Sequence, residues 1–240
     1  MAFSLLMQTL HGGSVPAVSM LPLRCENINC RRAPWSEAGQ GSVRDFSATF
    51  APGELAGFCG PDGSGKGLLL RVLGMIDKPD SGFLEVLGKN VFAMPEDDAR
   101  AWRDAAFGYL FTHPHLLPSL TIAENVAMPF LRFHDQDALQ ARRRTLEALE
   151  FTGISELHSL PVSELDVDTS WLVAMARAVI HRPALLIATS PTSPLLLPLA
   201  RRMADDFGTT VLWNGQKNEV APYADRLLEM EEGLATLARP

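Results

Sequence analysis

A glycine-rich stretch that includes a lysine is the part of this chain with the clearest chemistry. Residues 60–67 read Gly-Pro-Asp-Gly-Ser-Gly-Lys-Gly, the phosphate-binding loop pattern without the Ser or Thr that normally completes it. Glycines let backbone N–H groups approach phosphate oxygens, and Lys66 can reach the terminal phosphates of a nucleotide. Gly67 stands where a hydroxyl would ligate Mg²⁺. The residues predicted to bind the nucleotide are Gly60, Pro61, Asp62, Gly63, Ser64, Gly65, Lys66 and Gly67.

The segments around this loop are the ones that the motif requires. Residues 55–59 are a short apolar run, expected to be a buried strand, and residues 68–74 have helical character. A strand, a glycine loop and a helix in this order are the context in which the motif binds phosphate. The alternative is that the glycines serve only a tight strand-to-helix turn.

Composition limits the class of protein. The chain has 240 residues, of which 47% are hydrophobic, enough for one large domain with a full core. The formal net charge of −7 provides no basic footprint, so no nucleic-acid partner is expected. The one basic run, Arg142-Arg143-Arg144, falls in a helical stretch over 137–150 and is interpreted as a solvated face.

The sequence predicts neither a metal site nor a membrane span. The histidines match no ligand pattern, and no apolar run reaches the ~18 residues that a transmembrane helix needs. Residues 1–20 lack the positive start of a signal peptide and are expected to be a poorly ordered N-terminal extension. The cysteines show no metal-ligand spacing and are odd in number, which suits a reducing compartment; they are Cys25, Cys30 and Cys59.

Expected strands and helices alternate along the chain. Strands are expected at 21–28, 43–50, 55–59, 83–87, 184–188 and 209–213, and helices at 171–182 and 195–207. From 96 to about 165 helical patterns dominate, broken by Pro114, Pro118 and Pro129. The alternation predicts an α/β fold with a parallel sheet, whose two halves are separated by a helical insertion.

The order of these segments resembles the ATP-binding subunits of ABC transporters over roughly residues 20–235. The resemblance is greatest to the branch that serves lipoprotein release and macrolide export. It is carried by residues 52–54, 116–126, 173–178, 182–186, 191–192 and 224–226. It implies a P-loop NTPase-type parallel sheet core with an antiparallel β subdomain and a helical subdomain at about 96–165, within a nucleotide-binding domain over 21–240.

The departures from the family pattern fall on positions that do chemistry in the family. Thr112 replaces a glutamine at the end of the 109–111 strand. Thr189 and Ser190 replace the Asp-Glu pair that precedes Pro-Thr. Leu196 occupies the position of a loop aspartate, and Gln216 that of a histidine.

Two further departures concern the signature loop and the adenine. The family's Leu-Ser-Gly-Gly-Gln is replaced by residues 165–169, Leu-Asp-Val-Asp-Thr. Asp168 is expected to be the N-cap of the following helix, where its carboxylate would satisfy the donors that phosphate uses in the family. Arg32 falls near the position of the aromatic residue that stacks on adenine, and Trp35 is the closest aromatic side chain.

These substitutions predict that no catalytic residue remains at Thr112, Thr189, Ser190 or Gln216. No carboxylate is left to hold Mg²⁺ at the family's positions, and a serine hydroxyl cannot act as the general base at neutral pH. We therefore expect weak ATP binding, largely independent of Mg²⁺, or none, and no Mg²⁺ site.

The resemblance implies a subunit of a transporter complex, expected to be non-hydrolysing and to act as a structural or regulatory half. One implied partner is a transmembrane permease. The resemblance also implies a dimer, either with a second copy of this chain or with an intact ATP-binding subunit. Its implied place is the cytoplasm, peripheral at the cytoplasmic face of the membrane. Two alternatives stay open: an active or weakly active ATPase with an atypical site, and a soluble interaction module.

Overall fold

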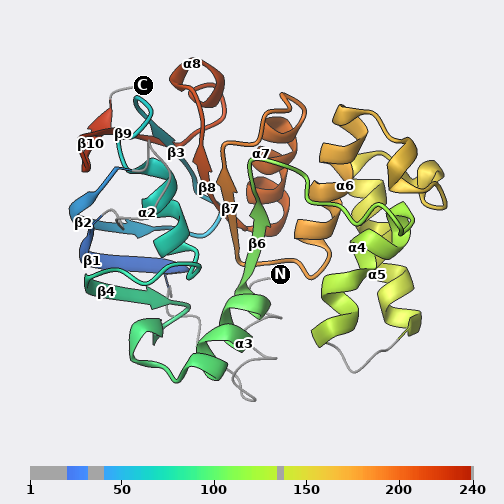
Figure 1. Ribbon diagram of the computed structural model, residues 1–240, viewed down its shortest axis with the longest axis horizontal. Helices are drawn as coiled ribbons and strands as arrows, with labels where there is room; N and C mark the ends of the chain where they lie inside the picture. The colour runs from blue at the N-terminus through green and yellow to red at the C-terminus, as the bar shows by residue number, and fades with distance from the viewer. Residues whose placement is uncertain (1–20, 32–40, 134–137, 239–240) are drawn as a thin grey trace.

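The computed structural model describes residues 21–31, 41–133 and 138–238, which build two sheets and their covering helices (Figure 1). The larger sheet has six strands in the order β10-β9-β3-β8-β7-β6. They are β3 (Leu55–Cys59), β6 (Phe107–Leu110), β7 (Leu185–Thr189), β8 (Thr210–Asn214), β9 (Arg226–Glu231) and β10 (Leu234–Ala238). Neighbouring strands pair in parallel, except that β10 pairs with β9 in antiparallel fashion.

Both faces of the larger sheet are buried, which explains why its central strands are continuous apolar runs. In β7, Leu185 and Ile187 belong to the core on the side of α2 (Lys66–Leu73). Leu186 and Ala188 belong to the core on the side of α7 (Leu196–Phe207). Successive side chains of a strand point to opposite faces, so one strand contributes to two cores.

The smaller sheet is antiparallel and has the order β2-β1-β4-β5. Its strands are β1 (Leu23–Cys30), β2 (Val43–Phe50), β4 (Ser81–Val86) and β5 (Lys89–Asn90). Helix α2 contacts β1 of this sheet as well as β7 and β8 of the larger one. Because α2 begins at Lys66, packing between the two sheets fixes the end of the phosphate-binding loop.

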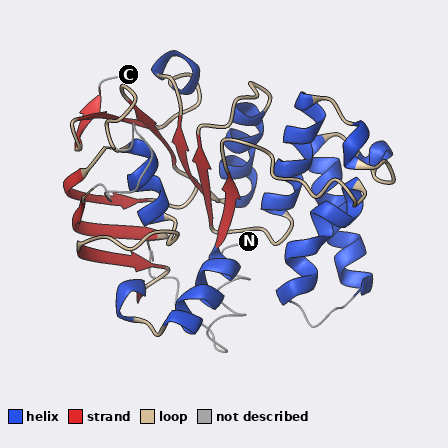
Figure 2. Cartoon of the chain, viewed as in Figure 1, coloured by secondary structure: helices blue, strands red, loops and turns tan. Residues whose placement is uncertain are grey.

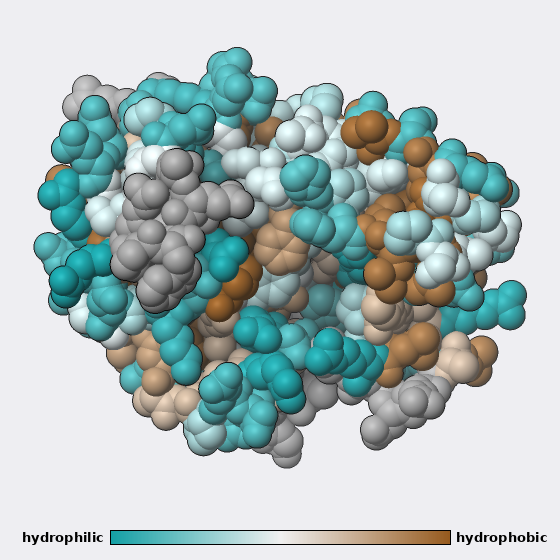
Figure 3. All heavy atoms as spheres, viewed as in Figure 1, coloured by the Kyte–Doolittle hydropathy of each residue, from teal (hydrophilic) through white to brown (hydrophobic). Residues whose placement is uncertain are grey.

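A layer of three helices lies at the end of the molecule away from the antiparallel sheet (Figure 2). It consists of α4 (Ile122–Phe133), α5 (Ala138–Thr152) and α6 (Val167–Val179), which pack on one another, and α6 also contacts β6. Hydrophobic side chains gather on the surface of this layer (Figure 3). The remaining helical segments are α3 (Glu96–Ala106), α8 (Lys217–Val220), η1 (Val91–Ala93), η2 (Ser155–Leu157) and η3 (Val162–Glu164).

The predicted α/β fold, with its parallel core, antiparallel sheet and helical region, is confirmed. Strands β2 and β3 have the predicted bounds. The predicted helical stretch over 96–165 is interrupted by β6, which pairs with β7 in the core sheet. The helix expected at 171–182 begins earlier, at Val167.

One expectation for the helical layer is wrong, and another holds only in part. Pro129 lies inside α4 and does not break it. An interior proline costs a helix about 3 kcal/mol, and the burial of Val126 and Phe130 of the same helix in the core offsets this cost. The run at 142–144 is only partly a solvated face. The Arg144 side chain is 24% exposed, and its guanidinium contacts Glu147 on the same helix at 3.3 Å.

Candidate functional site

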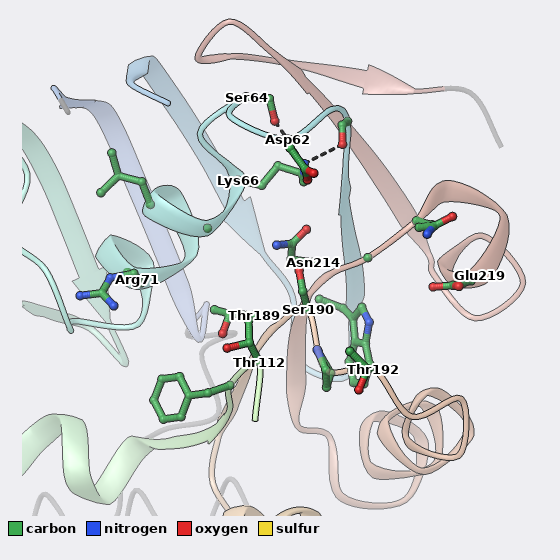
Figure 4. Close-up of a pocket in the computed structure, with 18 of the residues that line it drawn as sticks. Asp62, Ser64, Lys66, Arg71, Thr112, Thr189, Ser190, Thr192, Asn214 and Glu219 are labelled. Carbon is green, nitrogen blue, oxygen red and sulfur yellow. Dashed lines mark hydrogen bonds between the residues drawn. The ribbon is translucent and has the colours of Figure 1, made fainter. Parts of the chain in front are cut away.

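A cavity of about 1280 Å³ opens at the carboxyl ends of the core strands. Ligands in parallel α/β sheets bind at this edge. The phosphate-binding loop lines the cavity, apart from Pro61, and so do the segments that follow β6, β7 and β8 (Figure 4). The structure thereby brings together the predicted binding loop and the four substituted positions, which are Thr112, Thr189, Ser190 and Gln216.

The backbone of the loop requires glycine at two positions for reasons internal to the fold. Gly60 has φ 134°, and a Cβ there would lie 2.1 Å from the carbonyl oxygen of Met230. Gly65 has φ 97°, and its Cβ would lie 2.2 Å from the carbonyl oxygen of Ser42. These glycines are therefore needed for the strand-to-helix turn whether or not a phosphate binds.

Replacing Gly60 by alanine is expected to lower the free energy of unfolding by at least about 2 kcal/mol, because a side chain is strained at this φ and overlaps Met230. Urea denaturation measures the change. Gly67→Ala is the matched control, since no atom lies within 4 Å of its Cβ position, and its stability should not fall. Equal stability of the Gly60→Ala variant and the native chain would contradict the loop geometry.

Lys66 is held inside the loop. Its ammonium group donates to the carbonyl oxygens of Gly60 at 2.6 Å and Pro61 at 2.7 Å, and to Ser64 Oγ at 3.3 Å. The side chain is buried, and this burial lowers the pKa of Lys66. All three ammonium protons have acceptors in the loop, so a phosphate must compete with these bonds for the lysine.

The start of α2 has the features of a phosphate cradle. Among the described residues no side chain caps this helix at Gly65, so its first N–H groups are available at the cavity. The first intrahelical bond runs from Leu69 N to Gly65 O at 2.9 Å. A helix N-terminus with open donors suits an anion, so this end of the cavity fits the phosphates of a nucleotide.

The positions that follow the core strands carry neutral side chains. Thr112 Oγ1 lies 3.3 Å from His113 Nδ1, and Thr189 Oγ1 donates a long bond of 3.4 Å to Leu110 O. Ser190 follows β7 with a left-handed backbone, φ 59°. Leu196 begins α7 and is fully buried, so it faces the core.

Two carboxylates line the cavity away from the family's positions. Asp62 lies in the binding loop, and Glu219 lies on α8 (Figure 4). Glu219 was not predicted from the sequence, although its position three residues after Gln216 was the available signal. Asp80 lies outside the lining of the cavity, and its carboxylate accepts from Arg31 N at 2.6 Å.

The start of α6 differs from the prediction. Asp166, and not Asp168, is the N-cap: its Oδ1 accepts from Thr169 N at 2.7 Å, and this bond lowers the pKa of Asp166. The helix begins one residue after Asp166, which places Asp168 in its first turn. There Asp168 Oδ1 accepts from Ser193 Oγ at 2.9 Å, in the loop after β7.

The last turn of α6 binds the loop that follows β6. The Arg177 guanidinium donates to the carbonyl oxygens of Pro114 at 2.6 Å and His115 at 2.7 Å. His115 lines the cavity. Arg32 and Trp35, the residues considered for adenine, lie outside the described residues.

The fold and this cavity define a nucleotide-binding domain with a phosphate-binding loop. The chain belongs to the ABC transporter family, because the family described as "ABC transporter" matches residues 43–193. None of the helices in the described ranges is long and apolar enough to cross a membrane.

Within this family, the chain is similar in sequence to two kinds of transporter protein. The lipoprotein-releasing system ATP-binding protein LolD of Bordetella pertussis is 34% identical, over 80% of this chain and 85% of LolD. The macrolide export ATP-binding/permease protein MacB of Chlorobium luteolum is 32% identical over 85% of this chain. The chain spans only 31% of the length of that MacB.

Solved structures show the same fold. The dimeric structure of the ATP-binding cassette MJ0796 in a post-hydrolysis state, bound to ADP and Pi, superimposes with a TM-score of 0.77 at 22% identity, covering 91% of this chain and 99% of that one. The cbiO1 structure from Clostridium perfringens has a TM-score of 0.78 at 23% identity, covering 90% of this chain and 87% of its own.

Proposed function

We propose that this chain is an ATP-binding-type subunit of an ABC transporter complex that does not hydrolyse ATP. One observation carries the proposal: the cavity keeps its phosphate-binding loop, while the four substituted positions around it, Thr112, Thr189, Ser190 and Gln216, carry only hydroxyl or amide side chains. Phosphoryl transfer needs charge stabilisation and an oriented nucleophile. The subunit would then serve as a structural or regulatory half.

The donor set argues against a conventional Mg²⁺ site. Mg²⁺ prefers carboxylates and phosphate oxygens in octahedral geometry, whereas Gly67 has no side chain and Thr112 and Thr189 present neutral hydroxyls. Ser190 holds its proton too tightly to act as a base at pH 7. The phosphate cradle of α2 remains, which supports weak ATP binding with little dependence on Mg²⁺.

The partners follow from the relatives' names. LolD is the ATP-binding protein of a lipoprotein-releasing system, and MacB combines an ATP-binding part with a permease. We infer that this chain contacts a transmembrane permease at the cytoplasmic face of the membrane. Exposed apolar side chains in and before α4 support such a surface; they are Leu117, Met128 and Leu131.

The dimer is inferred in the same way, since the MJ0796 cassette is described as dimeric. In the family, a signature helix offers its N-terminus to the phosphate held by the opposite subunit. Here Asp166 caps that helix and Asp168 adds a second carboxylate to its first turn. Both disfavour an anion at this helix start. A second copy of this chain would present the same helix start, so we infer a dimer with an intact ATP-binding subunit, whose own signature helix could approach a phosphate bound by this chain.

Calorimetric titration of the purified chain with ATP, with and without Mg²⁺, tests the proposal. We expect weak binding that Mg²⁺ changes by less than about threefold, a difference of under 1 kcal/mol, and no hydrolysis above background. Lys66→Ala should abolish the binding. Tight, Mg²⁺-strengthened binding together with turnover that Lys66→Ala abolishes would overturn the proposal.

A second candidate function is a weakly active ATPase with an atypical site. The observation that favours it is the presence of Asp62 and Glu219 in the lining of the cavity. Glu219→Gln and Asp62→Asn separate the two candidates, because they remove charge and keep size. A turnover rate that falls in either variant favours the atypical enzyme, and background rates in all three proteins favour the non-hydrolysing subunit.

A further inference from the structure

Three arginines converge on one glutamate at the edge of the molecule opposite the phosphate cavity. Arg143 and Arg144 of α5 and Arg182, which follows α6, all contact the Glu147 carboxylate. The N–O distances are 3.7, 3.3 and 3.0 Å. These four residues are called the arginine cluster. Arg182 precedes the amino end of β7, whereas the cavity lies at the carboxyl end of the same strand. The two ends of a strand of this length are about 16 Å apart.

The arginine cluster carries unbalanced positive charge. Three guanidinium groups face one carboxylate, which leaves a formal excess of two positive charges. Burial and the neighbouring charge of Arg182 lower the pKa of Arg144. In the part of the chain that the structure describes, Arg144 Nε is buried without a hydrogen-bond acceptor. Because Arg144 Nε is out of reach of solvent, an oxyanion would instead meet the more exposed side chains of Arg143 and Arg182, which are 65% and 39% exposed.

Arg182 adopts a backbone conformation that favours glycine. Its φ is 53°, and its N–H donates to Val179 O at 2.8 Å where α6 ends. Glycine normally occupies the left-handed position after a helix, because other residues are strained there. The guanidinium lies over the Phe207 ring, 5.7 Å from its centroid. A strained position that holds a charged side chain over a ring and beside Glu147 points to a role for that side chain.

We propose that the arginine cluster binds a phosphate group, either as free phosphate or as the phosphomonoester of a lipid headgroup. A phosphomonoester carries about −1.5 to −2 charges at pH 7, which matches the excess of two, whereas a carboxylate supplies only one. Planar guanidinium groups are well suited to phosphate oxygens. This inference does not depend on whether the subunit hydrolyses ATP.

Calorimetric titration with inorganic phosphate tests the site in the full chain carrying Lys66→Ala, which disables the phosphate-binding loop. Adding Arg182→Gly should weaken phosphate binding by about tenfold, the effect of losing one charge-assisted hydrogen bond. Glycine suits the left-handed backbone, so loss of folding is not expected, and the thermal midpoint checks this. Adding Glu147→Gln instead should strengthen binding, because it removes the competing carboxylate.

Vesicles identify the source of the phosphate. The chain is sedimented with phosphatidylcholine vesicles that contain phosphatidic acid. A lipid headgroup is supported if the chain sediments with the vesicles, if Arg182→Gly abolishes this sedimentation, and if added inorganic phosphate reduces it. Phosphate binding without sedimentation supports a free phosphate. The proposal is overturned if inorganic phosphate and these vesicles both fail to bind, or if affinity is the same in the Arg182→Gly and Glu147→Gln proteins.

Discussion

Magnesium is expected to strengthen ATP binding by at least about tenfold, or 1.4 kcal/mol, in a Gly67→Ser, Thr189→Asp double variant, and not in the native chain. The change returns a hydroxyl to the end of the phosphate-binding loop and a carboxylate to the end of β7. These are the kinds of oxygen ligand through which phosphate-binding loops hold Mg²⁺ beside the nucleotide.

The structure has room for both substitutions. No atom lies within 4 Å of a Cβ placed on Gly67, so serine fits without a shift. Aspartate is close in size to threonine, and the only hydrogen bond recorded for Thr189 Oγ1 within the described residues is the long one to Leu110 O. Both positions line the same cavity.

Calorimetry with and without Mg²⁺ measures the effect. Gly67→Ala, Thr189→Asn is the matched control, because it fills the same space without a hydroxyl at 67 or a charge at 189. Its ATP affinity should remain insensitive to Mg²⁺. An equal Mg²⁺ response in the control and the double variant, or in the native chain, would show that the metal is held by other residues.

The largest expected effect on stability is that of Trp171→Ala. Trp171 is 2% exposed and belongs to the core that joins the helical layer to the larger sheet. Truncating a buried tryptophan to alanine costs about 3–5 kcal/mol, because apolar contacts are lost and a cavity is left. For a domain of this size that corresponds to a fall of roughly 6–20 °C in the thermal midpoint.

Urea and thermal denaturation check this prediction. Val167→Ala on the same helix is the matched control: its side chain is 72% exposed, so the change should stay within about 0.5 kcal/mol. A loss of less than about 1 kcal/mol in Trp171→Ala would contradict the placement of α6, because a side chain in solvent contributes no more than that.

The parts of the fold that the sequence predicted well are those with continuous burial. Residues 55–59 and 184–188 are apolar throughout because helices cover both faces of the sheet, so their pattern marked them as parallel strands. Strand β6 (Phe107–Leu110) was expected at 109–111 from the family resemblance alone, since its four residues lie between the helical patterns of α3 and α4. Short elements carry too little periodicity to be separated from their neighbours.

The candidate site likewise has features that the sequence predicts and features that it does not. The spacing of residues 60–67 predicts the binding loop, and the family resemblance predicts the positions of Thr112, Thr189, Ser190 and Gln216; the structure places all of these around one cavity, apart from Pro61. Contacts between distant segments could not be found. Asp168 was expected to cap its own helix, but the bond to Ser193 crosses 25 positions of sequence, and no local pattern encodes such a contact.

Helix α6 is bonded at both ends to loops that line the cavity. Asp168 in its first turn accepts from Ser193, and Arg177 in its last turn grips the carbonyls of Pro114 and His115. A hydrogen-bonded helix is stiff over this length, so a rigid helix connects the two loops. We therefore expect that a displacement of the loop after β6 would move α6, and with it the loop after β7, without any chemistry at the phosphate-binding loop.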